Sequence, residues 1–164
     1  MTRTKNDKAL KRRARQVAAL PVRVGAAGPE VLLVTSRDTG RWIAPKGWQQ
    51  RGVTGADMAA REAYEEAGVR GAVAAEPLAT YQYAKRLKGE RLRACEVDVH
   101  LLQVEEELAD WPERQQRQRR WFTPDAAASA TGEPGLVEVL RSLGGVGDAR
   151  AHGPHGASAV TGLD

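Results

Sequence analysis

The chain has 164 residues, with 25 Lys and Arg, 21 Asp and Glu, and a single cysteine, Cys95. This length suits one domain with a real hydrophobic core, and one cysteine excludes both an intrachain disulfide and a thiolate metal cluster. No apolar run reaches the length of a membrane span and no signal-peptide pattern is present, so we expect a cytoplasmic protein without membrane contact.

The positive charge gathers in an N-terminal tail. Residues 1–15 hold seven Lys or Arg against one Asp, which leaves 18 basic and 20 acidic residues in the remainder. We expect residues 1–14 to be a disordered tail, for which RNA contact, anionic-lipid contact and a transit function stay open, and we expect no nucleic-acid binding by the folded body. The Gly- and Ala-rich residues 146–164 predict a second disordered tail, so the domain covers residues 15–145.

The first third of the chain predicts strands. Residues 16–24 are largely apolar, and Pro21 within them indicates an edge strand or a bulge. Residues 30–35 contain a continuous apolar run, typical of a strand that is covered on both faces. A short strand at residues 41–44 then leads into Pro45-Lys46-Gly47.

A helix with three carboxylates follows. Thr54 and Asp57 indicate its start, and Gly68 indicates its end. At about 100° per residue, Glu62 and Glu66 lie roughly 40° apart, with Glu65 about 60° to the other side of Glu62. An alanine stripe on another face predicts packing on a sheet; it comprises Ala56, Ala60, Ala63 and Ala67. Carboxylates so crowded repel one another, and hard divalent cations usually stabilise such a cluster.

The second half of the chain predicts further strands and two helices. Strands are expected at residues 72–82, interrupted by Pro77, at residues 93–105 and at residues 117–122, with a basic hairpin-like connection at residues 85–91. Thr123-Pro124 opens a short helix. Residues 134–143 fit a closing helix whose inward positions are Leu136, Val139, Leu140 and Leu143.

The carboxylate helix also carries a family resemblance. Gly47, thirteen further residues and then the segment REAYEEAGV resemble the signature of the Nudix hydrolases, supported by Pro45-Lys46 just before. The family usually has another Glu six residues after the Gly, where this chain has Val53. The resemblance implies an α/β fold, a Nudix-type α/β/α sandwich with a central mixed sheet.

The resemblance implies magnesium, with manganese as a substitute. Glu62, Glu66 and Glu65 would be metal ligands, joined by the backbone carbonyl of Lys46 or Gly47. Glu65 would be the catalytic carboxylate that activates water, and Arg61 would orient a catalytic Glu by ion pairing, with an i,i+4 pair to Glu65 as a compatible arrangement. An acid outside this motif is an alternative water activator, with Glu96, Asp98 and Glu113 as candidates.

Other segments resemble the branch of diphosphoinositol polyphosphate phosphohydrolases: VLLVTSR, RWIAPKG, the dipeptide Asp110-Trp111, and an Arg-rich run ending in Trp121-Phe122. By this resemblance the substrate-binding residues are Ser36, Arg37, Lys46, Gly47, Arg91, Arg93 and Arg117. Guanidinium groups suit phosphate because they donate in a planar fork. One late basic position of the branch is acidic here, near Glu133.

We therefore expect a magnesium-dependent pyrophosphohydrolase that cleaves a phosphoanhydride bond in a highly anionic small molecule, namely a diadenosine polyphosphate, an inositol pyrophosphate or polyphosphate. A house-cleaning hydrolase of nucleoside di- or triphosphates is an alternative, although no base-sandwiching aromatic pair is evident. A ligand-sensing module is another, favoured by Val53 and disfavoured by the retention of all four charged motif residues. The sequence leaves the oligomeric state open.

Overall fold

The computed structural model describes residues 14–151, so the two predicted tails lie outside the described residues except at their inner ends. At those ends, Ala14 begins the first strand and the last helix continues to Ala151, past the domain boundary expected at residue 145. Within the described residues no helix is long and apolar enough to cross a membrane.

The strands form one mixed sheet. Their bounds are β1 Ala14–Gly25, β2 Gly28–Thr35, β3 Trp42–Ile43, β4 Lys46–Trp48, β5 Val69–Val73, β6 Ala79–Arg86, β7 Leu92–Glu107 and β8 Arg119–Phe122. The main path runs β3-β2-β1-β7-β5, while β4 pairs with β1, β6 with β7 and β8 with β2. Only the β1–β7 pair among these is parallel.

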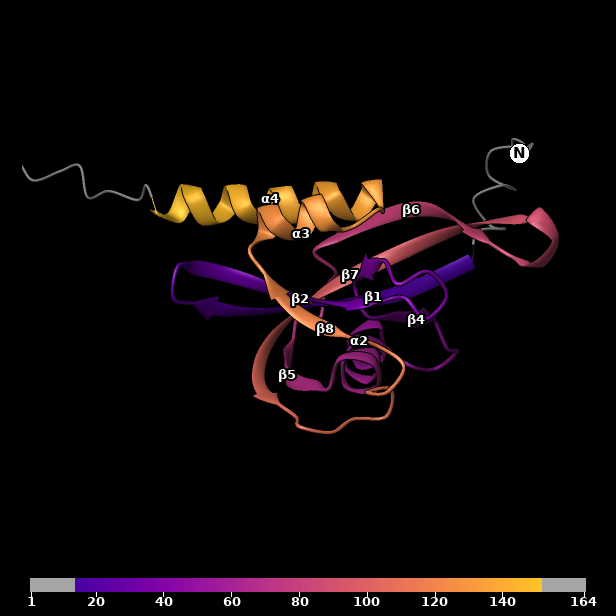
Figure 1. The fold of residues 1–164 in the computed structure, drawn as a ribbon, viewed down its shortest axis with the longest axis horizontal. Helices are drawn as coiled ribbons and strands as arrows, with labels where there is room; N and C mark the ends of the chain where they lie inside the picture. Colours follow the sequence, from indigo (N-terminus) through magenta and orange to yellow (C-terminus); the bar gives the residue numbers. More distant parts are fainter. Residues whose placement is uncertain (1–13, 152–164) are drawn as a thin grey trace, which may run out of the picture.

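The helices cover the sheet on both faces. Figure 1 shows α3 (Pro124–Ala130) and α4 (Pro134–Ala151) on one face, and α2 (Gly55–Glu62), continued by the π-helical turn η1 (Ala63–Ala67), on the other. Leu33 and Leu140 belong to the core under α4, and Leu32 and Met58 to the core under α2. The α/β sandwich and the two-sided burial of residues 30–35 are thus confirmed.

The prediction of an edge strand from Pro21 was wrong, because β1 is a central strand. It pairs with β7 along residues 14–22, and its other edge pairs first with β4 at residues 16–18 and then with β2 from Val22. Pro21 stands in the interval between those two partners, where a missing amide N–H leaves no ladder bond unmade.

Two strand boundaries and the buried alanine set also differ from the sequence prediction. Residues 72–82 are not one strand, because residues 74–78 around Pro77 separate β5 from β6. The strand expected from Arg117 begins at Arg119. In the carboxylate helix, the fully buried small side chains are those of Ala59, Ala63 and Ala67, whereas Ala56 and Ala60 are only half-buried.

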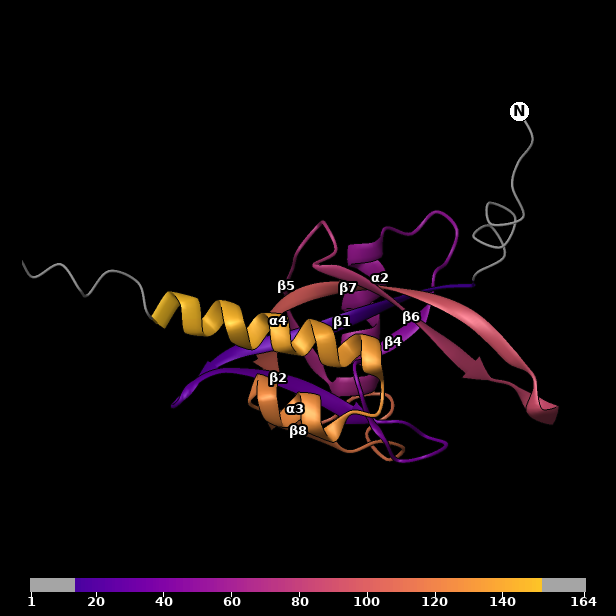
Figure 2. The same cartoon turned by 90° about the horizontal axis from the view of Figure 1, so that it is seen from above.

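The β6–β7 hairpin extends beyond the rest of the molecule (Figure 2). Its turn contains the short 3-10 helix η2 (Lys88–Glu90), and Leu87 N–H donates to the Arg91 carbonyl oxygen across 2.8 Å. The basic connection predicted at residues 85–91 is therefore the tip of this hairpin.

Replacing Gly71 by Ala should lower the free energy of unfolding by about 3 kcal/mol. A Cβ at residue 71 would lie 1.8 Å from the Gln103 carbonyl oxygen, at the register shift between β5 and β7, and backbone cannot rotate aside. Gly40→Ala is the control, since its Cβ meets nothing within 4 Å and only the left-handed φ of 66° resists it, at about 1 kcal/mol. Equal losses in urea unfolding would show that the β5–β7 contact tolerates a side chain at residue 71.

Candidate active site

The carboxylate helix begins and ends as its sequence predicts. Thr54 Oγ1 accepts from the Asp57 N–H at 3.1 Å, and Gly68 ends the helix in the left-handed region with φ of 64°. Between them α2 passes into the π-helical turn that carries Glu65 and Glu66. Such turns change the direction in which side chains leave the helix axis, and they recur at functional sites.

Glu66 is the buried member of the three carboxylates. Its side chain is 6% exposed, Oε2 accepts from the Lys46 N–H at 2.8 Å, and Oε1 accepts from Arg117 Nη2 at 2.7 Å. Burial raises the pKa of Glu66 to about 7, against the opposing effect of the Arg117 charge. This carboxylate is therefore held in place by donors from two other segments of the chain.

Glu62 lies against the backbone of Gly47. A Cβ on residue 47 would stand 2.2 Å from Glu62 Oε1, so a side chain here would displace the carboxylate. Burial, together with the charges of Glu65 and Glu113, raises the pKa of Glu62 to about 6. Strand β4 therefore contacts two carboxylates with backbone atoms alone, which brings the predicted residues Lys46 and Gly47 to the motif.

The loop of residues 108–118 closes over the end of the helix. Glu113 N–H donates to the Glu65 carbonyl at 3.0 Å, and Trp111 Nε1 donates to the Glu66 carbonyl at 3.1 Å. Arg119, the first residue of β8, donates to the Ala67 carbonyl at 3.0 Å. These bonds satisfy carbonyls that a helix end leaves without partners.

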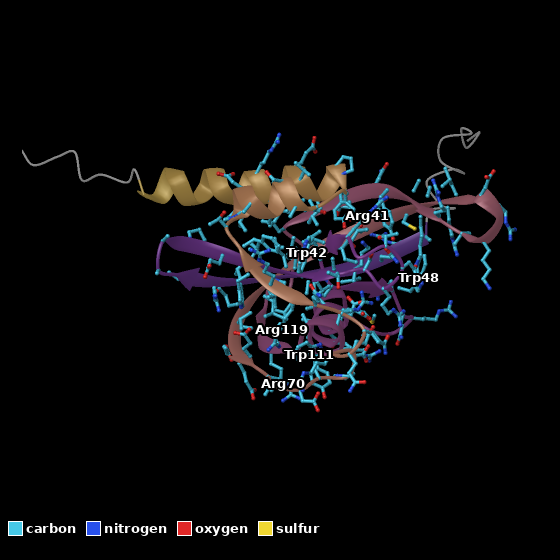
Figure 3. The ribbon with its side chains drawn as sticks, viewed as in Figure 1. Arg41, Trp42, Trp48, Arg70, Trp111 and Arg119 are labelled. Carbon is cyan, nitrogen blue, oxygen red and sulfur yellow. The ribbon has the colours of Figure 1, made fainter. Side chains whose placement is uncertain are left out.

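Trp111 and Arg119 form one unit beside that helix end (Figure 3). The Arg119 guanidinium lies 3.9 Å from the Trp111 ring centroid and also donates to the Leu108 carbonyl at 2.7 Å. Neither residue is predicted from the sequence to support the site, because the helix carbonyls to which they donate, those of Glu66 and Ala67, lie more than forty positions away.

Arg117 lies among the carboxylates with all its nitrogens engaged. Nε donates to Glu113 at 3.2 Å, Nη1 to the Thr35 carbonyl at 3.0 Å and Nη2 to Glu66 at 2.7 Å, while the side chain is only 6% exposed. The structure places the Arg117 guanidinium against Glu66 and Glu113, and substrate binding by Arg117 stays a prediction.

The other predicted arginines are more exposed. Arg61 donates to Gln50 Oε1 at 2.9 Å and forms no ion pair with Glu65 among the described residues. Arg37 donates to Gln116 at 3.1 Å and lies 3.7 Å from Glu113, which places it at the rim of the carboxylate group. Arg93 lies 5.3 Å from the ring of Trp48, next to Gly47.

Ser36 and Arg91 do not reach the carboxylates. Ser36 Oγ accepts from the Thr39 and Arg41 N–H groups and thereby shapes the loop that presents Arg37. Arg91 is exposed at the end of the β6–β7 turn, where its carbonyl accepts from Leu87.

Of the three candidate acids outside the motif, only Glu113 joins the carboxylates. Its charge contributes to the raised pKa values of both Glu62 and Glu66. Glu96 and Asp98 lie on β7 and pair with Arg15 of β1, at 3.7 and 3.2 Å.

Comparison with known families gives the site its context. The model of the NUDIX domain matches residues 12–143. The chain belongs to the NUDIX domain family. The predicted resemblance is thereby confirmed.

Two curated relatives illustrate its place among Nudix proteins. Nudix hydrolase 12, mitochondrial, of Arabidopsis thaliana is 40% identical over 97 residues, covering 57% of this chain and 48% of that protein. The human diphosphoinositol polyphosphate phosphohydrolase 3-beta is 33% identical over 132 residues, covering 77% and 72%. The chain spans about half the length of the first of these relatives.

Solved Nudix structures share the fold. A C. elegans Ap4A hydrolase has a TM-score of 0.58 at 18% identity, covering 82% of this chain and 98% of that chain. A NUDIX hydrolase from Nitrosomonas europaea has a TM-score of 0.64 at 18% identity, covering 82% and 90%.

The oxygen atoms at this Nudix site are of the type that binds a hard divalent ion. Glu62, Glu65 and Glu66 offer carboxylate oxygens and β4 offers backbone carbonyls, the ligands that magnesium prefers. Within residues 14–151, no three Asp, Glu, His or Cys side chains lie close enough together to coordinate one metal ion. Glu66 would have to exchange its bond from Arg117 for the ion.

Val53 takes the position of the usual Nudix Glu. It is partly buried and packs against the core cluster that contains Met58 and Ala59, and its carbonyl accepts from Gln49 Nε2 at 2.7 Å. A valine here supports the start of α2 by apolar contact and supplies no ligand.

Without divalent ions, stability should fall as pH rises, in part because of Glu66. Its folded-state pKa of about 7 lies above the usual 4.5, so this contribution is fully present below pH 4.5 and lost as pH rises through 7. In chelator, the parent should lose on the order of 2 kcal/mol more than Glu66→Gln between pH 5 and pH 8 in denaturant unfolding. Parallel pH profiles would show that Glu66 ionises freely.

Proposed function

We propose that this Nudix protein is a magnesium-dependent pyrophosphohydrolase that cleaves a phosphoanhydride bond in a highly anionic small molecule. The observation that carries the proposal is the buried carboxylate of Glu66, which the Lys46 N–H of β4 holds, together with Glu62 against Gly47 of the same strand. Burying a carboxylate among other carboxylates costs stability unless a positive charge compensates. The Arg117 guanidinium compensates this burial only in part, since the pKa of Glu66 stays raised to about 7, so the arrangement favours ion binding.

The residues have distinct tasks in this proposal. Glu62, Glu65 and Glu66 would hold the ion, which when bound supplies Lewis-acid stabilisation of phosphate oxygens and an activated water. The Lys46 N–H fixes the Glu66 carboxylate. Glu65 is proposed to accept the proton of the attacking water. Glu113 is the second candidate, because among the three candidate acids it is the one whose charge raises the pKa of Glu62.

Exposed cations support a substrate rich in phosphate. Arg37 is 59% exposed at the rim, and Arg93 is exposed next to Trp48. One relative is named a diphosphoinositol polyphosphate phosphohydrolase and one fold neighbour an Ap4A hydrolase, which agrees with an inositol pyrophosphate, a diadenosine polyphosphate or polyphosphate as the substrate class.

A panel of these three substrates and nucleoside triphosphates, assayed with magnesium and again with chelator, tests the proposal. We expect hydrolysis of at least one of the three polyanions, abolished by chelator and restored by magnesium or manganese. No turnover of any phosphoanhydride would leave a ligand-sensing module as the better description.

Glu66→Gln should reduce kcat by on the order of a hundredfold or more while the protein stays folded. Glutamine keeps the shape and still accepts from the Lys46 N–H, so the substitution removes charge rather than packing. Glu105→Gln is the matched control, because Glu105 is an exposed residue of β7. Parental turnover in Glu66→Gln, measured by phosphate release, would refute the assignment of the carboxylate helix.

A further inference from the structure

The Lys46 side chain is neutralised inside the protein. Its Nζ lies 2.6 Å from Glu133 Oε1, and the two side chains are only 8% and 17% exposed. The other oxygen of Glu133 accepts from the Tyr81 hydroxyl at 2.7 Å, and the ammonium also lies 4.9 Å from the ring of Tyr83. The motif lysine is therefore locked to an acid that directly precedes α4.

Lys46 contacts both faces of the sheet, one through its side chain and the other through its backbone N–H. In the β1–β4 ladder it pairs with Ala18, and Gly47 pairs with Val17. Ala18 belongs to the core under α4 and Val17 to the core under α2, so the Lys46 side chain lies on the α4 face. Its N–H nevertheless bonds Glu66 on the other side. The Lys46 ammonium therefore lies on the α4 face, within one lysine side-chain length of the backbone that holds Glu66.

We propose that Glu133 is a specificity-determining residue of this site, which acts by cancelling the positive charge of Lys46. This inference rests on the proposed function, because it concerns how strongly the site attracts phosphate. With Glu133 in place, the Lys46–Glu133 pair adds no net charge to the electrostatic field at the carboxylate group, and the attraction is left to exposed groups such as Arg37. Coulomb energy scales with the charge of the ligand, so freeing Lys46 should favour the most densely charged ligands.

Glu133→Gln tests the proposal, because it removes the charge while an amide oxygen can still accept from Tyr81 or Lys46. Calorimetric binding in chelator uses inorganic phosphate and tripolyphosphate as probes and needs no catalysis. We expect the affinity for tripolyphosphate to rise about threefold to tenfold and that for phosphate by less. With magnesium, the KM of the longest polyanion in the panel should fall while kcat changes little.

Three further variants separate the charge effect from a structural one. Glu133→Asp keeps the charge and should restore parental affinities, and Tyr81→Phe removes only a hydroxyl partner and should leave them unchanged. In a Lys46→Gln background, Glu133→Gln should no longer change the preference for tripolyphosphate. Persistence of the effect in that background would overturn the proposal, because Glu133 would then act without Lys46.

Equal tripolyphosphate affinity in the parent and Glu133→Gln, including undetectable binding by both, also overturns the inference. Failure of the proposed function looks different: the parent would hydrolyse no member of the panel, whereas the two proteins could still differ in binding. A uniform fall in kcat on all substrates, with unchanged KM, would assign Glu133 a purely structural role.

Discussion

The burial of one carboxylate organises this site. Glu66 is 5% exposed, and a carboxylate removed from water to that degree needs hydrogen-bond donors or a cation. The fold supplies a backbone N–H from β4 and a guanidinium from the loop before β8, two segments far apart in sequence. The raised pKa of about 7 indicates that these donors compensate only part of the burial. That remainder is what the binding of a divalent ion could offset.

A separate loop closes over the end of the carboxylate helix. Carbonyls at its end are satisfied by the Glu113 N–H, by Trp111 Nε1 and by the Arg119 guanidinium. These bonds fix the backbone of Glu65 and Glu66, so the positions of these residues do not depend on contacts of their carboxylates. The loop of residues 108–118 also delivers Arg117 and Glu113, and support and chemistry therefore come from one segment.

Local signals in the sequence predicted the helix and its ends well, since the Thr54 cap and the Gly68 stop depend only on nearby residues. The alternation and apolar runs likewise predicted most strands. Pro21 misled because its place between β4 and β2 depends on the order of strands in the sheet, which no local pattern encodes. The bonds of Trp111 and Arg119 were missed for the same reason.

The cations near the site show most clearly that local sequence patterns do not predict long-range contacts. The family resemblance groups Lys46 and Arg117 with Arg37 and Arg93 as residues that bind substrate. In the fold the first two are buried against Glu133 and Glu66, and the last two are exposed. A buried cation pairs with a buried acid because either alone would be costly to desolvate. A sequence motif gives the number of cations near a site, whereas the internal ion pairs, such as Lys46–Glu133 and Arg117–Glu66, depend on the fold.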